Sequence, residues 1–117
     1  MRNIIEFVDL IGVLKEFQWQ LDNTHDSYLV CTYYKDEEYS DIQTCDMFNV
    51  VEHVRTEQVE VWFDTDRTVM IKGNEFDKCI IEEKIDETTG DQAISCLRIY
   101  LNGRLRYVLT SSIREID

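Results

Sequence analysis

The chain has 117 residues, of which 44% are hydrophobic and 11% aromatic, and its formal net charge is −12. This length suits one domain with a single modest core, and the aromatic content excludes a wholly disordered chain. No apolar run approaches the roughly 20 residues that a membrane-spanning helix needs, and the N-terminus lacks the basic region of a signal peptide. We therefore expect one cytoplasmic domain, residues 1–117.

The first element that the sequence predicts is an amphipathic helix over residues 3–21. Asn3 and Glu6 have the spacing of a capping box, which would begin the helix at Asn3. The breadth of the apolar face predicts that the helix packs against a sheet. This face follows helical spacing and contains Ile4, Phe7, Val8, Ile11, Leu14 and Phe17.

Three different patterns follow the helix. Residues 28–34 are rich in β-branched and aromatic side chains, which predicts a strand. Residues 35–46 are polar and acidic, which is typical of a loop or an irregular sheet edge. The segment 47–54 fits either a short helix or a strand, and we favour a helix capped by Asp46.

The second half of the chain reads as strands separated by polar turns. Residues 57–64 alternate, with three apolar side chains on one face and Glu60, Trp62 and Asp64 on the other. Asn102-Gly103 is typical of a two-residue hairpin turn between two strands. The sequence therefore predicts an α+β fold, in which the N-terminal amphipathic helix packs on a mostly antiparallel sheet of about five or six strands that ends in this hairpin.

Four cysteines and two histidines are the candidates for nucleophilic or metal chemistry. No two cysteines have the C-x2-C spacing common in zinc sites, and no export signal points to an oxidising compartment. His25 or His53 could act as a base for Cys31 or Cys45, but neither cysteine lies at a glycine-rich turn that would form an oxyanion hole. We expect reduced, structural thiols, with no metal, no cofactor and no enzyme activity.

The negative charge is concentrated in one segment. Residues 22–66 contain twelve acids and two bases, a net charge of −10, whereas residues 1–21 and 67–117 each have a net charge of −1. Packing alone does not favour this concentration, because like charges repel one another in a compact state. An acidic surface repels nucleic acid and anionic lipid and attracts basic protein surfaces. The alternative is that the charge serves only solubility.

We expect acidic and aromatic side chains to form the partner-binding surface, since carboxylates can imitate phosphates and Trp and Tyr are common interface anchors. The alternative is a solvated sheet face with Trp62 covered by the acidic loop. We expect Arg98, Arg104 and Arg106 to share one face and to offset the acidic segment within the fold, or else to form the rim of an interface. The candidate binding residues are Tyr34, Asp36, Glu37, Glu38, Tyr39, Asp41, Asp46, Glu57, Glu60, Trp62, Asp64 and Asp66.

These features predict a small acidic inhibitor whose partner is a basic protein, such as a nuclease or another nucleic-acid-binding enzyme. In general character, without a shared motif, the chain resembles phage-encoded anti-restriction and anti-CRISPR proteins, and no residue role is carried over. One alternative is an immunity protein or antitoxin that neutralises a toxin, or another non-catalytic interaction domain. A further alternative is a small enzyme or metal-binding domain that uses Cys and His. Direct binding to nucleic acid or to a membrane is not expected.

Overall fold

The computed structural model describes residues 2–23, 27–34, 39–45, 48–64, 67–85 and 90–113. Within these residues the chain begins with a short strand, continues with one helix, and then forms eight further strands with one short 3-10 helix among them. In order these are β1 (Arg2–Ile4), α1 (Phe7–Asp22), β2 (Ser27–Tyr34), β3 (Tyr39–Cys45), β4 (Phe48–His53), η1 (Val54–Thr56), β5 (Gln58–Phe63), β6 (Arg67–Lys72), β7 (Phe76–Ile85), β8 (Gln92–Leu101) and β9 (Arg104–Ile113).

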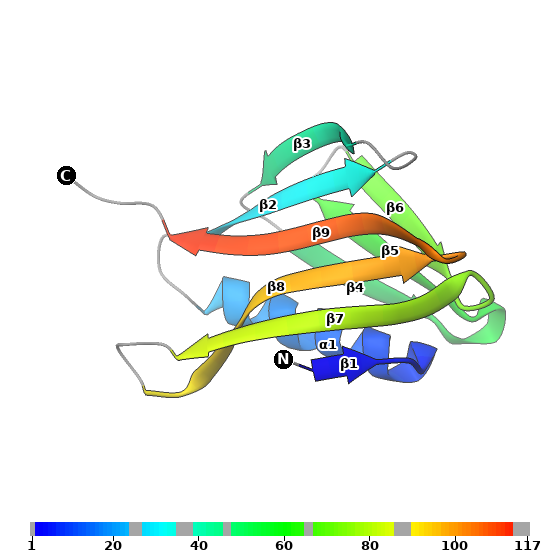
Figure 1. Ribbon diagram of the computed structural model, residues 1–117, viewed down its shortest axis with the longest axis horizontal. Helices are drawn as coiled ribbons and strands as arrows, with labels where there is room; N and C mark the ends of the chain where they lie inside the picture. The colour runs from blue at the N-terminus through cyan, green and yellow to red at the C-terminus, as the bar shows by residue number, and fades with distance from the viewer. Residues whose placement is uncertain are drawn as a thin grey trace.

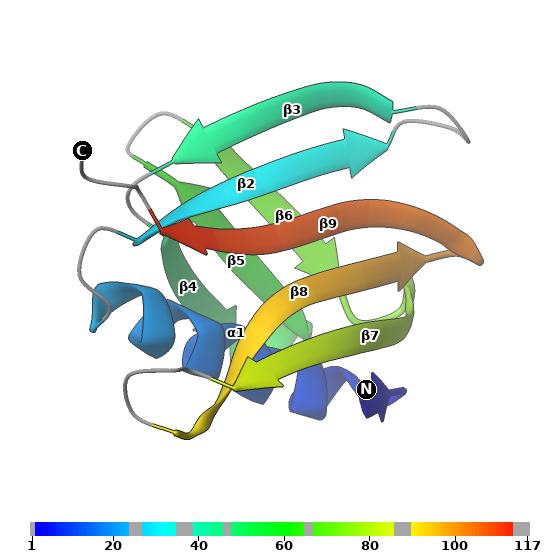
Figure 2. The same cartoon turned by 60° about the vertical axis from the view of Figure 1, so that its left-hand side comes forward.

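The strands form two antiparallel sheets. The larger sheet has the order β1-β7-β8-β9-β2-β3, and the smaller has the order β4-β5-β6. Figures 1 and 2 show the smaller sheet behind the larger one, with α1 along the lower side of the molecule. One helix on mostly antiparallel strands is the α+β fold that the sequence predicts. Two sheets with nine strands between them replace the single, smaller sheet that we expected.

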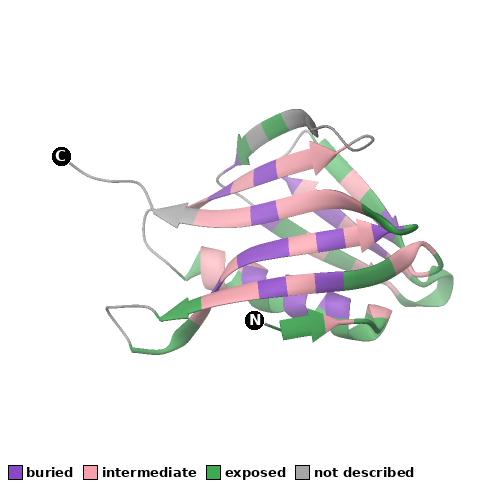
Figure 3. Cartoon of the chain, viewed as in Figure 1, coloured by how far each residue is buried: buried purple, intermediate pink, exposed green. Residues whose placement is uncertain are grey.

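The helix α1 closes the space between the two sheets. Leu10, Leu14 and Phe17 have no exposed surface, and they belong to one hydrophobic cluster that includes residues of both sheets. The Phe17 ring meets the Phe48 ring edge-on at a centroid distance of 5.8 Å, and Phe48 lies 5.8 Å from Phe63. Figure 3 shows the buried residues alternating along the strands and recurring along α1. The core therefore lies between the sheets and the inner side of α1.

Two glutamines of α1 bind backbone groups of the sheets. The Gln18 side chain accepts a hydrogen bond of 2.7 Å from the Val50 N–H, in the smaller sheet. The Gln20 side chain accepts a bond from the Ile94 N–H at 2.8 Å and donates one to the Ile94 carbonyl at 2.7 Å, in the larger sheet. Because partly buried backbone groups are costly to leave unpaired, these contacts fix the helix against both sheets.

The helix begins later than the sequence predicts. Residues 2–4 form β1, in which Asn3 pairs with Ile80 of β7. The N-cap of α1 is Glu6, which makes no side-chain capping bond, so the predicted capping box from Asn3 is wrong. Residues 2–4 form a strand because their backbone N–H and C=O groups pair with those of β7, and a helix that began at Asn3 would not make this pairing.

The buried face of the helix also differs in phase from the predicted one. The buried residues are Leu10, Ile11, Val13, Leu14 and Phe17. Val8, which we placed on the core face, is instead 71% exposed. The first half of α1 is apolar on nearly every side, so its pattern fits more than one face, and packing between the sheets selects the face.

The predicted helix over 47–54 is wrong, because Phe48–His53 is the strand β4 and only 54–56 turn as a 3-10 helix. Phe48 is buried and Val50 packs against the core, whereas Asn49 and Val51 point outward and are exposed. Every residue of β4 pairs with a residue of β5. The proposed cap, Asp46, lies outside the described residues. Adjacent β-branched valines suit this pleated pairing better than a helix.

Asn102 and Gly103 join β8 to β9, and both have positive φ, 51° and 76°. A register shift between Ile99 and Tyr100 then adds one residue to β9, so that Leu105 pairs with Tyr100 and Arg104 pairs with buried Leu101. Paired residues point to the same side of a sheet, so Arg104 does not share the face of Arg98. The predicted common face of these arginines is therefore wrong.

Gly73 joins β6 to β7 at a point where the backbone packs tightly. Its N–H donates a 2.8 Å bond to the Glu57 carbonyl, and a Cβ at this position would lie 3.0 Å from that oxygen and 3.1 Å from the Phe7 ring. We therefore expect Gly73→Ala to lower the free energy of unfolding by about 1–3 kcal/mol through overpacking, as measured by urea denaturation. Asn74→Ala, in the same turn, is the control and should change it by less than about 0.5 kcal/mol.

Candidate functional site

The central strand of the smaller sheet carries the best-defined group of candidate residues. As predicted, β5 alternates: Val59, Val61 and Phe63 are buried, and Glu60 and Trp62 lie on the opposite, outer face with partial exposure. Short hydrogen-bonded strands on both sides hold β5 in place. The alternation of β5 therefore presents a carboxylate and an indole together on the outside of the smaller sheet.

The Glu60 carboxylate organises this face. Its Oε1 accepts a 2.7 Å hydrogen bond from the Trp62 indole N–H, and its Oε2 lies 3.2 Å from His53 Nε2 on β4. The Glu60 side chain is only 18% exposed, so its carboxylate is largely shielded from water, whereas the His53 side chain is 40% exposed. Hydrogen bonds to a charged, shielded group are stronger than neutral ones, so the orientation of the indole is fixed before any partner arrives.

Two exposed apolar side chains flank Glu60 across the sheet. The register aligns Glu60 with Val51 of β4 and with Met70 of β6, and these two are 43% and 41% exposed. We call the group Val51, His53, Glu60, Trp62 and Met70 the outer sheet face. An oriented indole beside flexible and β-branched apolar side chains, around one carboxylate, has a composition that is common in protein interfaces.

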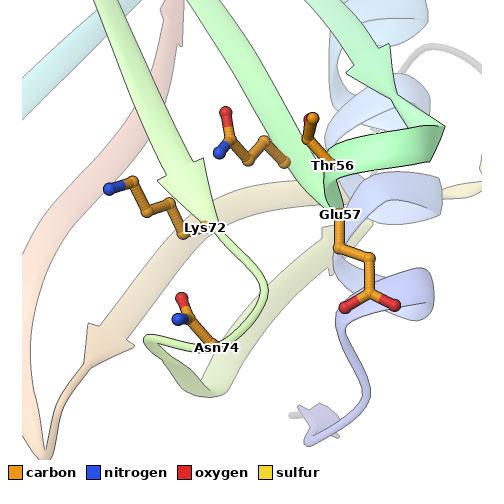
Figure 4. A pocket seen from close by; sticks show the side chains of 5 residues that line it. Thr56, Glu57, Lys72 and Asn74 are labelled. Carbon is orange, nitrogen blue, oxygen red and sulfur yellow. The ribbon is translucent and has the colours of Figure 1, made fainter.

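Glu57 and Asp64 lie just beyond the two ends of β5, and both have left-handed backbone conformations, with φ of 50° and 59°. Beside Glu57 is an open hollow of about 320 Å³, which Thr56, Gln58, Lys72 and Asn74 also line. Figure 4 shows the Glu57 and Lys72 side chains directed away from each other. The hollow therefore has polar walls without side chains that converge on one point.

The structure divides the predicted binding residues into two described groups. Glu57, Glu60, Trp62 and Asp64 lie on or beside β5. The other described candidates are at the edge of the larger sheet, where Tyr34 pairs with Tyr39 and Tyr33 with Asp41, although the side chains of Tyr39 and Asp41 fall outside the described part. Asp36, Glu37, Glu38, Asp46 and Asp66 lie outside the described residues.

Sequence reasoning missed three members of the outer sheet face, Val51, His53 and Met70. The segment that contains Val51 and His53 fitted either a helix or a strand, and we favoured the helix. Met70 lies in a predicted strand, but no pattern gave its register against Glu60. Only the pairing of β5 with β6 supplies that register.

The arginine of β8 pairs with an acid outside the acidic segment. Arg98 Nη1 binds the Glu82 carboxylate, which lies in β7 rather than in residues 22–66. Arg106 donates to the Tyr34 carbonyl at 3.4 Å. Within 22–66, Glu52 pairs with Lys15 of α1 at 3.7 Å, a long contact in which the Lys15 side chain is 53% exposed, so the pair is weak. The contact of Arg98 thus leaves the charge of the acidic segment unchanged.

The cysteines occupy the core. All four are buried, as expected of structural thiols. Burial raises the pKa of the Cys79 thiol to about 12, and the nearby Cys96 adds to this rise. Because Cys31 and Cys45 are buried, they are not accessible as nucleophiles. His53 contacts Glu60 rather than a cysteine, and His25 lies outside the described residues. Among the residues that the structure describes, no group of three or more His, Cys, Asp or Glu side chains is placed to hold a metal ion.

Burial of Cys79 and Tyr107 predicts a loss of stability in alkali. Burial also raises the pKa of Tyr107, from 10.0 to about 12, and the folded state thus holds both protons more tightly than the unfolded state. The resulting stability is complete below pH 9 and is lost as the pH rises from 9 towards 12. The urea concentration at the midpoint of unfolding should fall as the pH rises across this range. It should fall less for the double variant Cys79→Ala, Tyr107→Phe than for the native chain. A flat profile would contradict the assignment.

No protein-family model, curated protein or solved structure matches the chain. In the described part of the chain, no helix has both the length and the apolar character needed to cross a membrane. The fold defines the class, an α+β protein with two antiparallel sheets and one helix that closes the space between them.

Proposed function

We propose that this protein is a non-catalytic inhibitor that binds a basic, nucleic-acid-handling surface of another protein. The observation that carries the proposal is the charge distribution: residues 22–66, with a net charge of −10, include the central strand of the outer sheet face. A surface of clustered carboxylates speeds association with a basic cleft by long-range attraction.

The outer sheet face supplies what charge alone lacks, a contact that holds a partner after the encounter. Long-range attraction raises the association rate, whereas the lifetime of a complex depends on a few well-packed anchors. Trp62 suits this role because its indole is oriented by Glu60, whose cross-strand neighbours Val51 and Met70 are exposed and apolar. An oriented anchor loses little conformational freedom on binding.

Affinity capture by the tagged chain tests the proposal. The expected partner is a protein with a basic surface, released from the chain by salt and displaced by nucleic acid that competes for the same surface. A nuclease complex captured with its nucleic acid still bound would contradict occupation of that surface. Capture of one small toxin would instead favour the immunity-protein function.

A further inference from the structure

The outward side of α1 carries an apolar stripe that no described element covers. Val8 and Trp19 are 71% and 67% exposed, and Ile5, just before the helix, is 70% exposed. Val8, Gly12, Lys15 and Trp19 follow one another at intervals of four, three and four residues, so they lie on one face of the helix. This face is opposite the side that packs between the sheets. We call Ile5, Val8, Gly12 and Trp19 the helix stripe.

The packing of a single copy does not require a glycine at position 12, the centre of the stripe. Gly12 is exposed, and a Cβ built on it would meet no atom within 4 Å. Glycine is the least favoured residue in a helix interior after proline, so its position calls for another explanation. A glycine on an exposed helix face lets the backbone of a second helix approach closely, because the separation of packed helices depends on the side chains at the contact.

We propose that two copies of this chain associate through the helix stripe, with the two α1 helices crossing at Gly12. A two-fold axis at this point would bring one Gly12 against the other and bury Val8 and Trp19 of both copies. The contact would remove from water large apolar side chains that α1 leaves exposed in the single copy.

The charge of the helix segment favours a second copy over the basic partner. Residues 1–21 have a net charge of only −1, whereas the acidic excess lies in residues 22–66. A basic partner is therefore drawn to the middle segment, and two copies can meet at α1, whose own net charge is −2, from Asp9, Glu16 and Asp22 against Lys15. Interfaces between identical subunits are more apolar than those between transient partners, which fits Ile5, Val8 and Trp19.

Sedimentation equilibrium of the full chain tests this association. The mass should rise with concentration from 14.0 kDa to twice that value. Gly12→Glu places two carboxylates at the crossing and should raise the dissociation constant by roughly tenfold or more. Val54→Glu, at another exposed apolar residue, should leave the dissociation constant unchanged. A monomeric mass for the native chain at all concentrations up to roughly 1 mM would overturn the proposal.

Disulfide cross-linking gives an independent test of the geometry. Because the four native thiols are buried, Gly12→Cys introduces the one thiol of this region that is open to oxidation. This variant should form a covalent dimer, and Val51→Cys, on the outer sheet face, should form one far more slowly. Equal rates for the two variants would show that the helices do not meet at Gly12. Circular dichroism of each variant confirms the fold, and neither experiment requires the proposed inhibitor function.

Discussion

Replacing Phe17 with alanine is expected to lower the free energy of unfolding by about 3–5 kcal/mol. Phe17 is fully buried where α1 meets the smaller sheet, and its ring packs edge-on against Phe48. The substitution removes the buried ring surface and leaves a cavity that neighbouring groups fill only in part. Domains of this size are stable by only about 5–15 kcal/mol. Most molecules of the Phe17→Ala variant should therefore unfold at a moderate urea concentration.

Val54→Ala is the matched control for Phe17→Ala. Val54 is a large apolar side chain of the short helix η1 and is exposed, so its truncation should change the free energy of unfolding by less than about 0.5 kcal/mol. Urea denaturation followed by circular dichroism measures both variants. Similar midpoints for the two variants would show that α1 does not close the core as described.

Replacing Trp62 with alanine is expected to weaken binding to the basic partner by about 2 kcal/mol or more, roughly 30-fold in Kd. The indole lies on the outer sheet face and is oriented by its 2.7 Å bond to Glu60. Its removal takes away the largest side chain of that face without opening the core. Titration calorimetry with the captured partner measures the change, and the lost affinity should appear mainly as faster dissociation.

Two control variants separate this role from general effects. Trp62→Phe keeps an aromatic ring but loses the hydrogen bond to Glu60, and its affinity should fall between those of the native chain and Trp62→Ala. Trp19→Ala removes an indole from the helix stripe instead, and should leave partner affinity unchanged. Equal affinities of Trp62→Ala and the native chain would exclude the outer sheet face from the partner interface.

Local patterns predicted much of this fold. The alternation of β5 was interpreted correctly because one face is buried and the other is not. The α1 helix was recognised because its apolar side chains recur over four turns. Both predictions depended on the periodicity of apolar side chains within one element, and a short stretch of sequence is enough to show this periodicity.

The errors arose where distant segments decide the local structure. Asn3 belongs to a strand because β7, which begins more than seventy residues later, pairs with it. Phe48–His53 is a strand because β5 pairs with it along its whole length. The separate smaller sheet follows from these pairings, and no short-range signal specifies it.

The candidate site could be predicted only in part for the same reason. Glu60 and Trp62 were selected because they share a strand face, and the structure places them in contact. His53 and Met70 join them only through the register of neighbouring strands. The charge excess of residues 22–66 was visible in the sequence, whereas its arrangement around a partner depends on the tertiary fold.

The most direct test is the association rate constant with the captured partner, measured against ionic strength. For the native chain the rate should fall steeply as salt rises. Neutralising Asp36, Glu37, Glu38 and Asp41 together as amides should slow association and flatten this dependence, whereas Arg104→Gln with Arg106→Gln should do neither. A rate that is indifferent to salt, or equal effects of the two sets of substitutions, would contradict recognition through the acidic segment.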